Sequence, residues 1–384
     1  MKFDQVYNRR QSECVKWQAY PDGVLPLWVA DMDFQSPPAV LEALHQRVAH
    51  GIFGYGLPPA DFAGIVVERM QRLYDWTVEE KQISYVPGVV VGFNLGIRSV
   101  CKPGEAVIIH TPAYPPFFSG PNNAGLVCVK NPLIRNSDGS YAIDFDLFEK
   151  QVIDHQVKAF ILCNPQNPTG RVFTREELSR LAEICLRHHV IICSDEIHCD
   201  IVYDGRHHIP IASLSPEVSA ITMTFMAPSK TFNIAGLNAS VMITQNPQLA
   251  AKVSEVRNGI IGYPDVLAMT AARAAYKDGE EWLRELLVYL QANRDWLYQA
   301  LPVKLPGLRM SLPEGTFLAW LDCGALGYQG SYKDFFLEKA KVGLNDGLEY
   351  GIEGRNFVRL NFGTQRSVLV EAVERMSAAI RSGG

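Results

Sequence analysis

Strand-like and helix-like segments alternate from Ile83 to about Leu301, and this alternation limits the fold more than any other feature of the sequence. Short apolar, β-branched runs predict buried strands, and the amphipathic stretches between them predict helices that cover a sheet. The pattern favours an α/β fold. The expected strands are 83–86, 107–110, 126–129, 159–163, 190–193, 220–226 and 239–244, and the expected helices are 89–100, 174–187, 266–276 and 281–301.

The composition is that of a globular protein with room for one large core and a smaller domain. Of 384 residues, 47% are hydrophobic and 20% are charged. The net charge of -5 does not predict a basic surface that would bind a nucleic acid. Met1–Glu13 lacks the apolar core of a signal peptide, and no stretch is long and apolar enough to span a bilayer. We therefore expect a cytoplasmic protein without nucleic-acid or membrane partners.

The cysteines and histidines do not predict a metal site. The eight cysteines show no Cys-x-x-Cys spacing, and Cys163, Cys185 and Cys193 lie in apolar segments typical of reduced core thiols. The pairs His188–His189 and His207–His208 lack the spacing of metal ligands. We interpret both pairs as surface histidines and expect no metal.

The segment Ser219–Gly236 presents a single lysine just after a predicted strand. Pro228 cannot donate to a sheet ladder, so the chain must leave the sheet near it and place Lys230 on a short turn. The neighbours of Lys230 are small or apolar, and a desolvated ammonium loses its proton easily. A neutral lysine amine is the nucleophile that forms Schiff bases. The alternative is a surface lysine in a hairpin turn.

Other chemically distinctive residues also follow predicted strands, and the carboxyl ends of parallel strands gather at one edge of a sheet. Val89 and Val90 lie at a helix N-terminus, where free backbone N–H groups bind phosphate. Tyr114 could stack on a planar ring, Asn167 could donate to a phenolic oxygen, and Asp195 is an acid in an apolar setting. With an amine, these groups together predict a pyridoxal phosphate site, in which a carboxylate pairs with the ring nitrogen.

Each of these residues also has a structural interpretation when it is taken alone. Asn167 could be a turn residue, Asp195 a helix cap and Tyr114 a core aromatic. Their joint occurrence, in this order along the chain, favours the cofactor site.

Three further segments have an interpretation of their own. Gly51–Gly56 is a flexible loop that could bring Tyr55 to a ligand, although a buried anchor is an equal alternative. Arg359 lies in an apolar strand, 357–361, and needs either a carboxylate or phosphate ligand or a structural salt bridge. Leu25–Phe34 predicts a packed N-terminal arm, and Ser36 is a plausible cap of the helix that follows.

The sequence resembles the fold-type I pyridoxal-phosphate enzymes of the aminotransferase class I/II family over nearly its whole length. The most specific marks are Asn-Pro-x-Asn-Pro-Thr-Gly at 164–170 and Ser229-Lys230. Within the family, the segments 27–34, 194–198 and 354–361 are similar to the MalY/PatB type, which comprises cystathionine β-lyases or cysteine-S-conjugate C–S lyases. The resemblance implies an α/β fold whose large domain holds a mostly parallel, seven-stranded sheet flanked by helices. It also implies a smaller α/β C-terminal domain.

The resemblance also implies a role for each site residue. Lys230 would form the imine with pyridoxal 5'-phosphate and shuttle the proton, Asp195 would pair with the pyridine nitrogen, and Arg359 would clamp the substrate α-carboxylate. Tyr55 would reach the phosphate of the neighbouring subunit, which requires a homodimer. The remaining implied contacts are Asn167 to the ring hydroxyl, Tyr114 on the ring, His198 beside the cofactor, Val89, Val90 and Ser229 on the phosphate, and Ala30 in the substrate site.

Two departures from typical aminotransferases bear on the activity. His198 stands where they usually carry a tyrosine, which favours the lyase branch. Gly236, Leu237 and Asn238 stand where they carry an arginine for the phosphate, so the phosphate ligands are less defined.

The predicted function is therefore α,β-elimination of L-cysteine thioethers to thiol, pyruvate and ammonia. A transaminase acting on an L-amino acid and a 2-oxo acid is one alternative, and a regulatory binding protein that retains the scaffold is another. We expect an N-terminal arm and helix at 1–45 that pack with the small domain, a large cofactor-binding domain at 46–280 and a small domain at 281–384.

Overall fold

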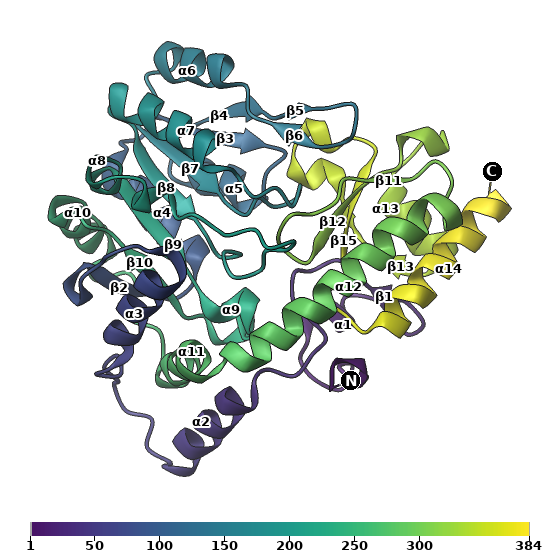
Figure 1. The fold of residues 1–384 in the computed structure, drawn as a ribbon, viewed down its shortest axis with the longest axis horizontal. Coiled ribbons are helices and arrows are strands. Elements are labelled where there is room, and N and C mark those ends of the chain that lie inside the picture. The colour runs from purple at the N-terminus through teal and green to yellow at the C-terminus, as the bar shows by residue number, and fades with distance from the viewer. Residues whose placement is uncertain (1, 384) are drawn as a thin grey trace.

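A seven-stranded sheet forms the centre of the molecule in a computed structural model that describes residues 2–383 (Figure 1). The strand order is β2-β10-β9-β8-β7-β3-β4, and β10 runs antiparallel to both of its neighbours while the other strands share one direction. The sheet is thus mostly parallel, as predicted. Its strands are β2 (Ile83–Val86), β3 (Ala106–Thr111), β4 (Val127–Pro132), β7 (Ala159–Cys163), β8 (Ile191–Asp195), β9 (Thr222–Met226) and β10 (Ser240–Ile243).

Helices cover both faces of this sheet because its strands carry apolar side chains on both sides. In β7, Phe160 and Leu162 pack with α6 (Phe145–Asp154) and α7 (Arg175–Arg187), whereas Ile161 joins the core under α4 (Val89–Val100) and α10 (Pro247–Arg257). Strands buried on both faces are typical of parallel sheets. Further elements of this part are α3 (Phe62–Tyr74), α5 (Pro116–Asn123), α8 (Pro216–Ala220), α9 (Pro228–Thr231), α11 (Val266–Asp278), and the hairpin of β5 (Ile134–Arg135) and β6 (Tyr141–Ala142).

A smaller antiparallel sheet of order β11-β12-β15-β14 lies beside the large one (Figure 1). The long helix α12 (Glu280–Lys304) and the last helix α14 (Arg366–Gly383) pack against each other in this part of the molecule. The remaining elements here are β11 (Arg309–Met310), β12 (Leu318–Asp322), α13 (Tyr332–Phe335), β13 (Val342–Gly343), β14 (Asn345–Asp346) and β15 (Phe357–Asn361).

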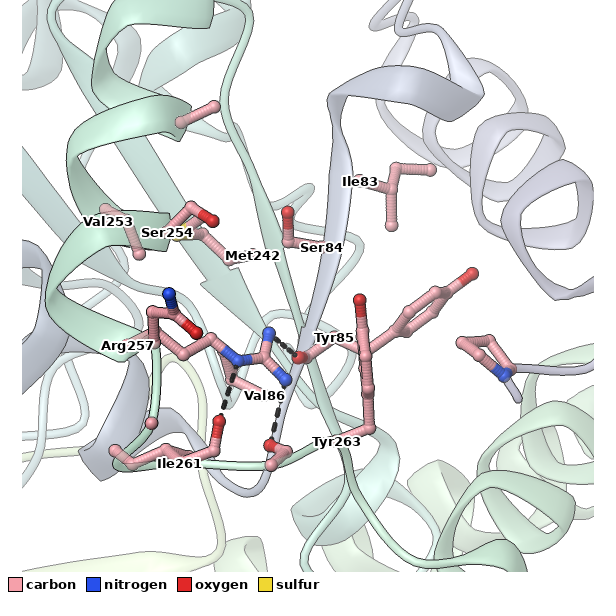
Figure 2. Close-up of a pocket in the computed structure, with 15 residues that line it drawn as sticks. Ile83, Ser84, Tyr85, Val86, Met242, Val253, Ser254, Arg257, Ile261 and Tyr263 are labelled. Carbon is pink, nitrogen blue, oxygen red and sulfur yellow. Dashed lines mark hydrogen bonds between the residues drawn. The ribbon is translucent and has the colours of Figure 1, made fainter. Parts of the chain in front are cut away.

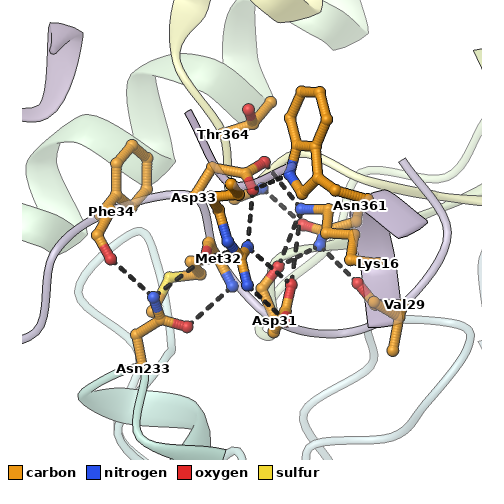
Figure 3. Close-up of polar contacts among 12 residues, drawn as sticks. Lys16, Val29, Asp31, Met32, Asp33, Phe34, Asn233, Asn361 and Thr364 are labelled. Carbon is orange, nitrogen blue, oxygen red and sulfur yellow. Dashed lines mark hydrogen bonds and ion pairs between the residues drawn. The ribbon is translucent and has the colours of Figure 1, made fainter. Parts of the chain in front are cut away.

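The N-terminal arm contacts both parts of the molecule. Its strand β1 (Leu25–Pro26) pairs with β13, while α2 (Pro38–Ala49) packs against α11. The short helix α1 (Val15–Gln18) carries Lys16, whose side chain is fully buried and forms a 2.7 Å ion pair with Asp33 (Figure 3). The arm is therefore an integral part of the core.

The structure corrects three local expectations. Ser36 does not cap α2, because its Oγ donates instead to the carbonyl of Asn233, and the helix begins after Pro37. The expected strand 220–226 begins only at Thr222, since Ser215 caps the short helix α8 just before it. The turn around Lys230 is a short helix, α9, rather than a hairpin turn.

Between residues 2 and 383, the structure contains no helix with the length and apolar character needed to cross a membrane.

Candidate functional site

A cavity of about 420 Å³ opens at the carboxyl edge of the large sheet. The parallel strands β2, β3, β7, β8 and β9 all end there, and because β10 runs in the opposite direction, the residues before it reach the same edge. This is where open α/β sheets bind ligands. Ten of the eleven predicted site residues line the cavity: Ala30, Val89, Val90, Tyr114, Asn167, Asp195, His198, Ser229, Lys230 and Arg359.

Lys230 lies at the end of β9 on the short helix α9, and its amine faces the cavity. Nζ donates a 2.6 Å hydrogen bond to the carbonyl of Ala30 and forms no ion pair with a described carboxylate. Burial lowers the pKa of Lys230 to about 8, and Arg359 acts in the same direction, while Asp31 and Asp195 oppose the shift. An amine with this pKa is neutral in roughly a tenth of the molecules at pH 7 and can then act as a nucleophile or base.

Asp195 ends β8 and is 4% exposed. Its carboxylate accepts a 3.1 Å hydrogen bond from the Ile197 backbone and pairs with no described cation. Burial raises the pKa of Asp195 to about 7, an increase that the Ile197 N–H and Lys230 partly offset. A buried acid without a cationic partner is ready to receive one from a ligand.

Arg359 is buried in β15, yet no described carboxylate forms an ion pair with it. Its guanidinium donates to three neutral oxygens: Asn167 Oδ1 at 3.0 Å, the Trp28 carbonyl at 2.9 Å and Asn345 Oδ1 at 2.7 Å. The Arg359 Nε is buried and has no partner among the described residues. The alternative of a structural salt bridge is therefore wrong, and the positive charge is available to a ligand.

His198 and Tyr114 form further parts of the cavity wall. His198 packs edge-on against Phe317 with ring centroids 5.9 Å apart, and its buried Nδ1 has no described partner. Burial and the charges of Lys230 and Arg359 lower the pKa of His198 to about 3, so this ring is neutral. Tyr114 is half-buried and packs edge-on against Phe117, which leaves it at the cavity rather than in the core.

The N-terminus of α4 supplies free backbone N–H groups to the cavity. Gly88 precedes the helix with φ of 106°, a backbone conformation that glycine adopts without strain. Val89 and Val90 follow at the first helical positions, and Ser229 lines the same cavity. Unpaired N–H groups at a helix N-terminus favour a phosphate or another anion.

The lining residues that the sequence did not predict include Trp28, Asn345, Glu349 and Tyr350. Asn345 and Trp28 bind Arg359, and the guanidinium lies 5.0 Å from the centroid of the Tyr350 ring. The short strand β14 and the 3-10 helix at Gly347–Tyr350 show no periodicity in the sequence. The one sequence signal that pointed to them was Arg359, because a charged residue within the apolar run 357–361 needs partners.

Tyr55 is the one predicted site residue outside the cavity, and it is fully exposed. The alternative of a buried anchor is therefore wrong for the single chain. Beyond its loop lies a separate cavity of about 410 Å³, where Arg257 donates to the carbonyls of Tyr85 and Gly262 and stacks on Tyr263 (Figure 2). None of the predicted site residues lines that cavity.

The interpretation of His207–His208 as surface histidines is wrong for His208. Its side chain is fully buried, and Nε2 lies 2.7 Å from a Glu196 carboxylate oxygen. Glu196 follows Asp195 and points away from the cavity, where it also accepts from Ser194 Oγ at 2.8 Å. The histidine is buried because the loop after β8 folds back over this acid, a contact that sequence spacing does not reveal.

Comparison with known proteins identifies the family. The model described as "Aminotransferase class I and II" matches residues 22–376. Cystathionine beta-lyase PatB of Bacillus subtilis (strain 168) is 41% identical over 99% of this chain and 100% of its own length, and protein MalY of Escherichia coli (strain K12) is 34% identical over 99% of both.

A solved structure agrees with these relatives. Cystalysin from Treponema denticola, whose crystal structure contains a pyridoxal 5'-phosphate cofactor, matches with a TM-score of 0.95 at 31% identity. The match covers 99% of this chain and 98% of that one. The chain therefore belongs to the aminotransferase class I and II family and has the fold of its fold-type I members.

Proposed function

We propose that this protein is a pyridoxal-phosphate-dependent C–S lyase, which converts L-cysteine thioethers to thiol, pyruvate and ammonia. The observation that carries the proposal is the pairing of a buried amine of lowered pKa with a buried, unpaired acid in one cavity. The relatives PatB and cystalysin support it through the activity and the cofactor that their names state.

The residues of the cavity fit the coenzyme. Lys230 would bond covalently to its aldehyde carbon, and Asp195 would pair with its ring nitrogen, which gives the buried carboxylate a cationic partner. The N-terminus of α4, with Val89, Val90 and Ser229, would hold the phosphate. The remaining contacts would come from Asn167, Tyr114 and His198.

The reaction requires a proton to leave the substrate Cα and a thiolate to leave its Cβ. Pyridoxal phosphate, when bound, supplies an electron-poor ring that stabilises negative charge developing at Cα. Lys230 Nζ would accept the α-proton, since it is the described amine that faces the cavity. Arg359 would bind the α-carboxylate and so orient the Cα–H bond, while Ala30 lines the substrate side.

A product assay tests the proposal against transamination. Purified protein, supplied with coenzyme and S-methyl-L-cysteine but no 2-oxo acid, should release methanethiol and pyruvate in equal amounts. Turnover that depends on an added 2-oxo acid would show a transaminase instead. Borohydride reduction followed by peptide mapping should place the coenzyme on Lys230, and a label on another lysine would contradict the site.

We also propose that the protein is a homodimer in which Tyr55 completes the neighbouring site. Tyr55 is fully exposed in the single chain, and Ile52, Phe53 and Leu57 around it are exposed as well. The loop packs near the start of α11, since a side chain at Gly56 would collide with Val266. A second copy of the chain is the partner that would bury this apolar loop.

Mixing two inactive variants tests the dimer. Tyr55→Ala damages only the partner's site, and Lys230→Ala damages only the site of its own chain. A mixed dimer then holds one intact site, so a refolded equimolar mixture should regain about a quarter of the wild-type activity. A mixture as inactive as its components, or a monomer in sedimentation, would contradict the proposal.

The domain boundaries 1–45, 46–280 and 281–384, and a cytoplasmic location, also remain proposals. All eight cysteines are free thiols, which supports a reducing compartment.

A further inference from the structure

The positive charge of Arg359 is held by neutral groups in a way that needs explanation. The side chain is 3% exposed, and buried guanidinium groups normally pair with a carboxylate. Here Asn167, Asn345 and the Trp28 carbonyl supply the acceptors, and Nε has none. The shortest of these hydrogen bonds, at 2.7 Å, joins the Arg359 guanidinium to Asn345 Oδ1.

The nearest carboxylate in this network is that of Glu349, and the side-chain amide of Asn345 lies between it and Arg359. The Asn345 Nδ2 donates a 2.9 Å hydrogen bond to Glu349 Oε2, while its Oδ1 faces Arg359. An asparagine amide can be turned over with little change in shape, so only its partners fix which end faces the arginine. Glu349 can accept a hydrogen bond but not donate one when ionised, and it therefore forces the amide oxygen toward Arg359.

We infer that Asn345 and Glu349 are positioning residues that keep the Arg359 guanidinium ordered but unneutralised, so that it can bind a carboxylate of the substrate. An acid at position 345 would bind the guanidinium itself and compete with the substrate. The Asn345 amide instead accepts from Arg359 in an orientation that Glu349 fixes, and it keeps the Glu349 negative charge out of contact with the guanidinium. This inference rests on the proposed function, in which Arg359 binds the substrate α-carboxylate.

A charge swap tests the inference. The double variant Asn345→Asp/Glu349→Gln keeps the size, the hydrogen bond and the net charge of the pair, but it moves the negative charge next to Arg359. We expect the KM for S-methyl-L-cysteine to rise by about tenfold to a hundredfold, because the guanidinium is already paired. We expect kcat to change by less than about threefold, because a substrate that does bind still places its α-carboxylate on Arg359 and so keeps its Cα–H bond oriented.

A binding measurement separates this inference from the proposed function. Methylthiopropionate has the carboxylate and the thioether but no amino group, and methylthiopropanol lacks the carboxylate. Measured by calorimetry, the affinity for methylthiopropionate should be at least about tenfold lower in the double variant than in the wild type, and the affinity for methylthiopropanol should be unchanged. The inference would be overturned if the wild type and the double variant bound methylthiopropionate equally well, or if the double variant lost the same affinity for both ligands. Absence of thiol release by the wild type would overturn the proposed function alone.

Single variants of Glu349 provide a second test if the swap does not fold. Its side chain is 38% exposed, and besides Asn345 it accepts a 3.4 Å hydrogen bond from the Asp346 backbone N–H. Glu349→Met removes the acceptor that orients Asn345, and we expect its KM to be about threefold to tenfold above that of the wild type. Glu349→Gln retains an acceptor oxygen, and we expect its KM to lie within about twofold of the wild-type value. Lys333→Met is the matched control, because Lys333 lies 3.8 Å from Glu349 on the exposed side. A Glu349→Gln enzyme as impaired as Glu349→Met would contradict the orienting role of Glu349.

Discussion

Asp195 illustrates how a buried charge can be prepared for a ligand at the expense of stability. Burial raises its pKa to about 7 in the folded chain, whereas an unfolded aspartate titrates near about 4. Between these pH values the folded state holds a proton that the unfolded state has released. The unfolding free energy contributed by this carboxyl is therefore greatest at low pH and decreases as the pH rises through about 7.

Replacing this acid should stabilise the coenzyme-free protein in a pH-dependent way. The amide introduced by Asp195→Asn cannot ionise, so the advantage of this variant in melting temperature over the wild type should grow from about pH 5 to about pH 7 and then level off. The gain corresponds to a free energy on the order of 2–4 kcal/mol. Differential scanning calorimetry across this range measures it. An advantage that is constant with pH would contradict the raised pKa.

The sequence predicted residues that the structure brings into one cavity, but not their hydrogen-bond partners. Lys230 and Asp195 were recognisable because each lies at or just beyond the end of an apolar strand, and the strand order then brings them together. Asn345 and Glu349 follow no such pattern. The contact of Asn345 with Arg359 depends on the pairing of β14 with β15, which is set by the folded sheet, and Glu349 reaches Arg359 only through Asn345.

At the level of elements, strands and helices were predictable where one local signal was unopposed. The bounds of β2, α4, β7 and β15 agree with expectation because apolar residues dominate each segment. Ser36 failed as a cap because its hydroxyl binds the distant Asn233 carbonyl instead. Tertiary contacts of this kind override local preference.

Helix α7 has a cap whose contribution can be measured. Thr174 Oγ accepts from the Glu177 backbone at 3.2 Å, and the Glu177 carboxylate accepts from the Thr174 backbone at 2.8 Å, which is a capping box. Thr174→Ala should lower the unfolding free energy by about 1 kcal/mol, and Thr174→Ser should largely preserve it. Denaturant titration provides the measurement. Because Thr174 lies outside the cavity, a changed kcat would contradict a purely structural role.

At the level of the whole molecule, residues 28–34 form a strap between the smaller sheet and the loop after α9, and Figure 3 shows its contacts with Asn361 and Asn233. From the smaller sheet, Asn361 donates to the carbonyls of Val29 and Asp31. From the loop after α9, Asn233 donates to the carbonyls of Met32 and Phe34. None of these contacts could be foreseen, because the partners lie about 200 to 330 residues apart in the sequence.

The buried ion pair of Lys16 with Asp33 anchors this strap, and a mutant cycle can measure its coupling. Lys16→Met leaves Asp33 with Arg9 as its remaining charged partner and should lower the unfolding free energy by about 3 kcal/mol. The double variant Lys16→Met/Asp33→Leu also removes the Asp33 negative charge, and it should recover most of the lost unfolding free energy. Thermal unfolding of the four proteins gives the coupling. Additive losses would show that the two side chains act independently.

Residues 28–30 are held by their backbone, which leaves the side chains of Val29 and Ala30 free to change. Arg359 donates to the carbonyl of Trp28, Asn361 to that of Val29 and Lys230 to that of Ala30. All amino acids carry this oxygen, so a point mutation at these positions alters the cavity wall without releasing the chain. The range of accepted thioethers can thus drift over evolutionary time, one substitution after another, while the catalytic framework stays constant.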